Sequence, residues 1–116
     1  MRHRKKKVTL DRKTGPRGLL LRSLAVSMLL HEHVQTTAAK ARAVRPLVER
    51  CITIGKGGTL TDRRHLLALL AHRPTVAKLM EVLGPKYRER PGGYTRTIRL
   101  GRRLGDAAET VRLELV

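Results

Sequence analysis

The stretch Pro91-Gly92-Gly93-Tyr94-Thr95-Arg96-Thr97-Ile98-Arg99-Leu100 decides the fold class, because the spacing of apolar residues changes there. From this point the residues alternate with a period of two, which is typical of a β-strand. One set of positions holds Tyr94, Arg96, Ile98 and Leu100, and the other holds Thr95, Thr97 and Arg99. Residues 111–115 alternate in the same way. We therefore expect two strands joined by a loop at about residues 101–109, and an antiparallel hairpin is the simplest topology.

Upstream of this stretch the apolar residues recur every three or four positions, which is the period of amphipathic helices. We expect helices at about residues 17–30, 38–54, 62–71 and 75–83. The apolar stripe of the second helix should consist of Ala41, Val44, Val48, Cys51 and Ile52. The sequence thus predicts an α+β fold in which about four short helices pack with a small antiparallel sheet.

Threonine, proline and glycine residues set the expected helix ends. Residues 34–36 have the composition of a short, β-leaning link, and Thr37 is placed to cap the second helix by accepting a bond from an early backbone N–H. Pro46 should kink that helix or break it in two, and the glycine-rich residues 55–58 should end it. Gly84-Pro85 should stop the fourth helix.

The chain is strongly basic, with 26 Lys and Arg against 9 Asp and Glu and a formal charge of +17. Residues 1–22 hold nine of the cations against one Asp, and residues 86–103 hold seven against one Glu. The first segment is too charged and too poor in apolar residues to bury. We expect an extended basic arm at residues 1–16, a single domain at residues 17–116, and a polyanionic partner.

The scarcity of aromatic residues argues against one mode of nucleic-acid binding, the stacking of bases on aromatic side chains. Tyr87 and Tyr94 are the only aromatic residues, whereas single-stranded nucleic acid is usually bound by stacking bases on aromatic side chains. Contacts to the phosphates of folded or duplex nucleic acid are favoured instead. The sequence also has no bilayer-spanning apolar run and no signal-peptide pattern at its start, so we expect an intracellular protein without a membrane partner.

No motif for catalysis or metal binding stands out. The five histidines lack the spacing of a zinc site, and Cys51 lies at an apolar helical position, which predicts a buried, inert thiol. The sequence Gly-Lys-Gly-Gly at residues 55–58 follows a helix and lacks the spacing of a phosphate-binding loop. We expect no enzyme activity, cofactor, metal ion or small-molecule substrate.

Five segments, in order along the chain, match one known family. They are Met1-Arg2-His3, Leu29-Leu30-His31-Glu32, Thr36-Thr37-Ala38-Ala39-Lys40-Ala41-Arg42, Arg90-Pro91-Gly92-Gly93-Tyr94-Thr95-Arg96 and Glu114-Leu115-Val116. In this colinear set the chain resembles the bacterial-type ribosomal protein seventeen of the large subunit. Members often have a His-Arg pair before the first helix and Arg-Asn within it, where this chain has Pro16-Arg17 and Arg22-Ser23.

The resemblance implies a structural constituent of the large ribosomal subunit, present as a monomer beside other large-subunit proteins. Such a protein binds 23S-type ribosomal RNA on the solvent side, near the peptide exit tunnel. The resemblance further implies a cytoplasmic ribosome, with an organellar one left open. The RNA-binding residues that we expect are Arg2, His3, Arg4, Lys5, Lys6, Lys7, Arg12, Lys13, Arg17, Arg22, Lys40, Arg42, Arg45, Arg90, Gly92, Gly93, Tyr94, Arg96, Arg99, Arg102 and Arg103.

Three of these residues have more specific expected roles. Gly92 and Gly93 would permit a tight turn or a close approach of the backbone to RNA. Tyr94 would either stack on a base or pack within the protein, and packing is the better prediction.

Two other classes of protein remain open. The helices at residues 62–71 and 75–83 could form the helix-turn-helix of a nucleoid or regulatory DNA-binding protein, although two helices packed in a small core are the better interpretation. A membrane-active cationic protein is a more distant alternative, because the heaviest charge lies outside the amphipathic helices.

Overall fold

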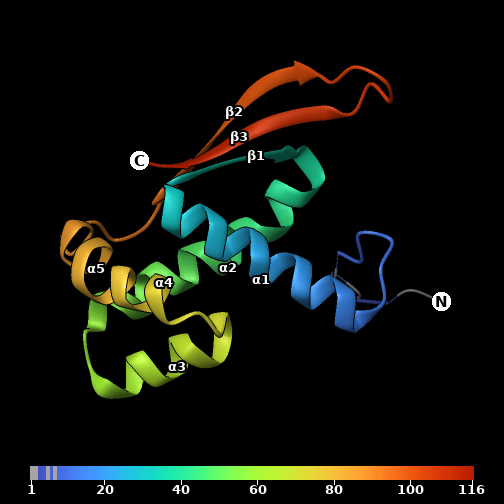
Figure 1. Cartoon of the computed structure of the whole chain (residues 1–116). Coiled ribbons are helices and arrows are strands. Elements are labelled where there is room, and N and C mark those ends of the chain that lie inside the picture. The colour runs from blue at the N-terminus through green and yellow to red at the C-terminus, as the bar shows by residue number, and fades with distance from the viewer. Residues whose placement is uncertain (1–2, 5, 7) are drawn as a thin grey trace.

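The computed structural model describes residues 3, 4, 6 and 8–116. Its helices are α1 (Thr14–His31), α2 (Ala38–Gly57), α3 (Leu60–Leu70), α4 (Arg73–Lys78), the π-helical turn η1 (Leu79–Leu83) and α5 (Gly84–Lys86), and its strands are β1 (His33–Thr37), β2 (Thr95–Arg102) and β3 (Glu109–Leu115). Figure 1 shows the sheet along one side of α1 and α2, with α3, α4 and α5 gathered at the other. The expected α+β fold class is confirmed.

The core lies where α1 and α2 meet each other, the sheet and the later helices. The stripe expected on α2 is confirmed, because all five of its residues are buried. Towards it α1 contributes Ala25, Met28 and Leu29, and β3 contributes Val111 and Leu113. The alternation of apolar and polar residues on β3 is therefore that of a half-buried strand, with one face in the core.

The two ends of α2 follow the sequence closely, but its interior and its cap do not. The helix begins after Thr37, as expected, yet the Thr37 side chain makes no capping hydrogen bond. Of the two outcomes expected at Pro46, a break is wrong, since α2 continues through it as one helix. Val44 and Val48 are buried on either side of this proline, and their packing offsets the lost backbone bond. Gly58, with φ of 69°, ends the helix.

The expected stop at Gly84-Pro85 is wrong. The helical path runs without interruption from Arg73 to Lys86, and η1 supplies its middle turn. The amide of Gly84 donates to the carbonyl of Leu79, which is the wider spacing of a π turn. Gly84 also lies against α2, because a Cβ there would be 2.7 Å from the carbonyl oxygen of Gly55. Glycine at this position therefore permits close helix packing and does not end the helix.

The sheet has three strands, one more than the hairpin that the alternating residues predicted. The expected pairing of β2 with β3 is confirmed, but residues 33–37 form β1 and pair with the other side of β3. The order is β1-β3-β2, and all pairs are antiparallel. A register shift between Arg99 and Gly101 interrupts β2 near the hairpin tip. The central strand β3 is thus the last in sequence. Residues 34–36, which we expected to be a short link, belong to an edge strand of the sheet.

Candidate nucleic-acid interface

The first two turns of α2 meet the hairpin, and six of the expected RNA-binding residues lie around this junction. They line two clefts: Arg42, Arg45 and Arg99 line the first, and Lys40, Arg102 and Arg103 line the second. We call these six residues the α2–hairpin surface. They come from positions about 60 residues apart in the sequence, and the packing of the sheet on α2 brings them together.

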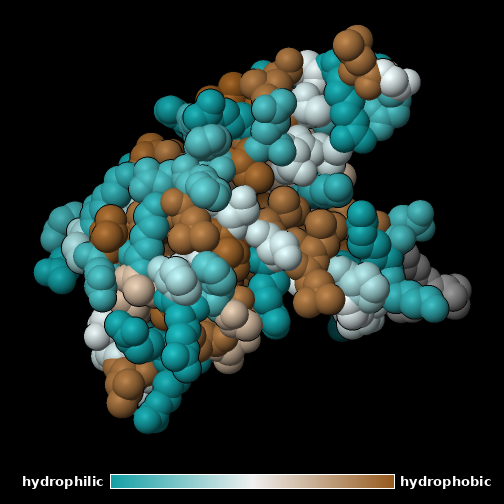
Figure 2. All heavy atoms as spheres, viewed as in Figure 1, coloured by the Kyte–Doolittle hydropathy of each residue, from teal (hydrophilic) through white to brown (hydrophobic). Residues whose placement is uncertain are grey.

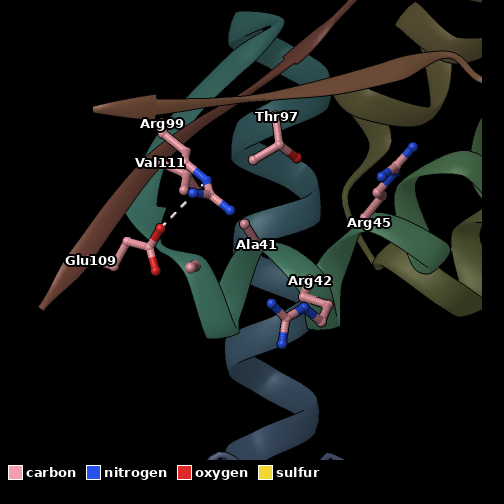
Figure 3. Close-up of a pocket in the computed structure, with 8 residues that line it drawn as sticks. Ala41, Arg42, Arg45, Thr97, Arg99, Glu109 and Val111 are labelled. Carbon is pink, nitrogen blue, oxygen red and sulfur yellow. Dashed lines mark ion pairs between the residues drawn. The ribbon is translucent and has the colours of Figure 1, made fainter. Parts of the chain in front are cut away.

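The first cleft has a volume of about 300 Å³ and lies between α2 and the inner face of the hairpin. Ala38, Ala41 and Val111 supply its apolar part, and Thr97 and Glu109 complete the lining. Figure 3 shows Arg99 reaching from the sheet towards Glu109, while Arg42 and Arg45 project from α2 in different directions. Arg99 and Glu109 form an ion pair with 3.6 Å between Nε and Oε1.

The second cleft, of about 740 Å³, lies between the end of β1 and the hairpin tip. Its three cations differ in their partners. Arg103 donates two hydrogen bonds to Asp106, of 2.6 and 2.8 Å, and these hold the pKa of that carboxyl well below its usual range. Lys40 and Arg102 have no ion-pair partner among the described residues. These two cations therefore remain available to an external anion.

Arg96 lies on the opposite face of β2 from Thr97 and Arg99, as strand alternation requires. It donates a 2.6 Å hydrogen bond to Glu114 across the strand pair, and Arg112 contacts the same carboxylate at 3.1 Å. The hydrogen bond from Arg96 lowers the pKa of Glu114. Arg96 is thus set apart from the α2–hairpin surface and is already paired within the sheet.

Two expected contact residues on α1 have structural partners instead. Arg17 is buried, with hydrogen bonds to the carbonyl of Arg12 and the hydroxyl of Thr14. Arg22 is half-buried and donates to the carbonyl of Leu69 at 3.1 Å, which ties α1 to the end of α3. The structure therefore gives both side chains a role in packing within the domain.

Tyr94 packs within the protein. Its side chain is 1% exposed and meets the ring of Tyr87 edge-on, with 5.2 Å between centroids. Lys56 donates to the Tyr94 hydroxyl at 2.9 Å and to the carbonyl of Arg90 at 2.6 Å. Burial acts to raise the pKa of Tyr94, but hydrogen bonding with Lys56 and Thr53, together with the positive charge of Lys56, outweighs it, so that this pKa lies below its usual value. Packing is confirmed, and no face of the ring is open to a base.

The two glycines before β2 differ in conformation. Gly93 has φ of 63°, in the left-handed region that favours glycine, whereas Gly92 does not have a positive φ. A Cβ at either position would meet nothing within 4 Å, so both stand at an open surface. Of the two, Gly93 has the backbone conformation that a tight turn uses, and the exposed Arg90 lies three residues before it.

The described residues of the basic arm lie on the same side of the molecule as the hairpin tip. In Figure 1 both project to the right, with the start of α2 between them, and in Figure 2 they stand apart across a hollow in the surface. His3, Arg4, Lys6, Arg12 and Lys13 are exposed. Arg2, Lys5 and Lys7 of the expected set lie outside the described residues. Helix α1 begins at Thr14, so it takes in the last residues of the expected arm.

Groups considered for other chemistry have ordinary structural places. Cys51 is fully buried, and burial raises the pKa of its thiol to about 11, so the expected buried thiol is confirmed. Leu66 and Leu70 of α3 and Val76 of α4 enter the core, as expected for packed helices. In the part of the chain that the structure describes, no three His, Cys, Asp or Glu side chains could together hold a metal ion. Nor is any described helix long and apolar enough to cross a membrane.

Sequence reasoning missed the two carboxylates that face the cleft arginines, Glu49 and Glu109. It also missed the Thr95 hydroxyl, which donates a hydrogen bond to Glu49. Glu109 faces Arg99, and Glu49 lies 3.6 Å from Arg45 while accepting a 2.8 Å hydrogen bond from the buried hydroxyl of Thr95. The four-residue spacing of Arg45 and Glu49 on a helix was a signal that could have shown their pairing. The pairing of Glu109 with Arg99 could not be predicted without the register of the hairpin, which a shift between Arg99 and Gly101 makes irregular.

Comparison with known proteins places the chain in a family. The family model described as Ribosomal protein L17 matches residues 20–116. The chain is 51% identical over 107 residues to large ribosomal subunit protein bL17 of Desulfitobacterium hafniense, covering 92% of this chain and 96% of the relative. It is 46% identical to the protein of that name from Thermomicrobium roseum, over all of this chain and 99% of the relative. The chain belongs to the ribosomal protein L17 family.

Proposed function

We propose that the chain is a structural constituent of the large ribosomal subunit that binds ribosomal RNA. The observation that carries this proposal is the gathering of six cations around the start of α2, on the side where the basic arm also projects. Its relatives of similar length are named large ribosomal subunit proteins. A surface of this charge, without an exposed aromatic ring among the described residues, suits phosphate contacts to folded RNA.

The finer assignments belong to the same proposal. The resemblance supports a place on the solvent side of a cytoplasmic large subunit, near the peptide exit tunnel and beside other ribosomal proteins, with no catalytic role. The contacts should come from the described arm residues and the α2–hairpin surface. Arg17, Arg22, Tyr94 and Arg96, and within the α2–hairpin surface Arg103, should contribute less, because each already has a partner within the domain.

Sedimentation of a native lysate through a sucrose gradient tests this proposal. We expect the chain to remain on large subunits and polysomes in stoichiometric amount at both low and high salt. Salt weakens the attraction between exposed charges, but a surface that makes many contacts to RNA should stay bound. Recovery with DNA or at the top of the gradient would sink the ribosomal assignment, and recovery with DNA would favour a nucleoid protein.

A further inference from the structure

The first cleft differs from the rest of the basic surface in how its arginines are held. Arg96 and Arg103 donate hydrogen bonds of 2.6 Å to carboxylates. Arg45 and Arg99 only approach theirs, at 3.6 Å, which is beyond hydrogen-bond length. The cleft arginines are therefore placed by charge while their N–H groups stay available. Arg42, on the same cleft, has no ion-pair or hydrogen-bond partner among the described residues.

The two carboxylates at this cleft have unequal attachments. Glu49 accepts a hydrogen bond from Thr95, whose side chain is buried, so Glu49 is fixed to the sheet and positions Arg45. The Glu109 side chain is 53% exposed, and its only described partner is Arg99, itself 86% exposed. An exposed pair of this kind is weak and easily exchanged. Glu109 can therefore release Arg99 to a stronger anionic partner at little cost.

The wall of the cleft formed by α2 also suits an anion. Ala38, the first residue of this 20-residue helix, lines the cleft together with the small residue Ala41. The first turn of α2 contains no acidic residue, and Thr37 makes no side-chain cap bond. The early backbone N–H groups thus add positive potential to that of the cleft arginines.

From these contacts we infer that the cleft is a receptor for one backbone phosphate of the ribosomal RNA, and that Glu109 gives up Arg99 to this phosphate on binding. The inference rests on the proposed function, since it names the chemistry of one contact within that interface. Arg99 closes over the phosphate from the sheet. Arg45 and Arg42, which project from α2 in different directions (Figure 3), turn towards it on binding. Their guanidinium groups supply planar, paired donors suited to phosphate oxygens. No covalent bond changes.

Charge-neutral substitution of the displaced carboxylate provides the test. The full chain and its Glu109→Gln variant are titrated with a large-subunit rRNA transcript at one fixed salt concentration. We expect the variant to bind about two- to fivefold more tightly than a matched control, Glu81→Gln, since an exposed ion pair is of that strength. Glu81 is exposed on η1 and carries the same charge change away from the cleft.

Blocking the cleft should have the opposite effect. Ala38→Glu places a carboxylate at the first position of α2, where a negative charge favours the helix, so the variant should fold. We expect its RNA affinity to fall at least about tenfold, because charged contacts to phosphate are strong. Arg99→Gln, a change at a highly exposed side chain, should weaken binding in the same direction and serves if Ala38→Glu fails to fold.

The outcomes separate this inference from the proposed function. If the unmodified chain binds the rRNA but Glu109→Gln matches Glu81→Gln, and Arg99→Gln binds as the unmodified chain does, the cleft is not the phosphate receptor and the ribosomal role stands. If the unmodified chain binds the transcript no better than duplex DNA of equal length, both proposals fail together.

Discussion

At the scale of single residues, Lys56 shows how one exposed-looking cation can be structural. It leaves the last turn of α2 and bonds to Tyr94 and to the carbonyl of Arg90, so it fixes the segment that leads into β2. Because the Tyr94 ring is buried beside Tyr87, its hydroxyl depends on this partner. Lys56 is therefore a basic residue that stabilises the fold.

The change Lys56→Met should lower the free energy of unfolding by about 1–2 kcal/mol, since it keeps the aliphatic chain but removes a charged donor from two acceptors. Chemical denaturation of Lys56→Met, Tyr94→Phe and the double variant measures the coupling. The second change should cost less in the presence of the first. Strict additivity of the two losses would show that the bond of 2.9 Å contributes nothing.

Glu114 carries the pH dependence of the outer face of the sheet. The hydrogen bond from Arg96 holds the pKa of this carboxyl below its usual value, which is about 4.3 in unfolded chains. A pKa lowered by folding gives stability that is complete above the unfolded-state value and is lost as pH falls through the folded-state value. The contribution of this contact to the pairing of β2 with β3 should therefore be complete above about pH 4.3 and decline as the pH falls below it.

An NMR titration of the Glu114 side chain should place its midpoint below that unfolded value. Replacing Arg96 by Gln should move the midpoint upward, because the hydrogen bond and the nearby positive charge are both removed. Equal midpoints in the two proteins would mean that the contact with Arg96 does not persist in solution.

At the scale of elements, the helical path from Arg73 to Lys86 depends on a missing side chain. The π turn of η1 and the close approach of Gly84 to Gly55 occur together, so α2 and the later helices meet backbone to backbone. Local sequence preference at Gly84-Pro85 favours a helix end, but packing against α2 outweighs it. Proline adds little cost there, because the widened turn already changes the bonding pattern.

The change Gly84→Ala should therefore destabilise the protein by about 1–3 kcal/mol, since its Cβ would lie 2.7 Å and 3.0 Å from two carbonyl oxygens that belong to packed backbone. Gly92→Ala is the matched control, as nothing lies within 4 Å of its added Cβ. It should change stability by no more than about 0.5 kcal/mol. Thermal unfolding of both variants decides the matter, and equal midpoints would contradict this account.

At the scale of the whole molecule, folding redistributes the charge that the sequence assigns to residues 86–103. Strand β3 places Glu109 and Glu114 against β2, and Asp106 bonds Arg103 at the tip. The carboxylates come from outside the basic segment and reduce its excess once the hairpin forms. For the described arm residues no ion pair is formed, so the arm keeps its charge for a partner.

This difference predicts a difference in salt dependence. Replacing both Arg12 and Lys13 by Gln should reduce the slope of log affinity for rRNA against log salt concentration by about 2, if each meets one phosphate. The same replacement of Arg96 and Arg103 removes equal charge but should change the slope by less than about 1, because both are already paired. Equal changes of slope would mean that the internal ion pairs exchange freely with RNA.

The sequence by itself determined the helical and strand periods, the stripe of α2, the buried thiol, the hairpin and the two basic segments, because these are local patterns of side-chain spacing and charge. The order of five short motifs along the chain was enough to indicate the family, which the comparisons confirmed. Local spacing also predicted helix starts at about Ala38 and Asp62, and the structure begins these helices at Ala38 and Leu60.

Only the tertiary structure decided which of these residues act together. Whether residues 33–37 form a strand depends on the edge of β3, and whether Gly84 ends a helix depends on Gly55, so neither could follow from neighbouring sequence. Packing likewise gave Arg17 and Arg96 internal partners and left Arg42 and Arg99 on one cleft. Charge is a property of each residue, but its availability to a phosphate depends on the carboxylates that the fold brings beside it.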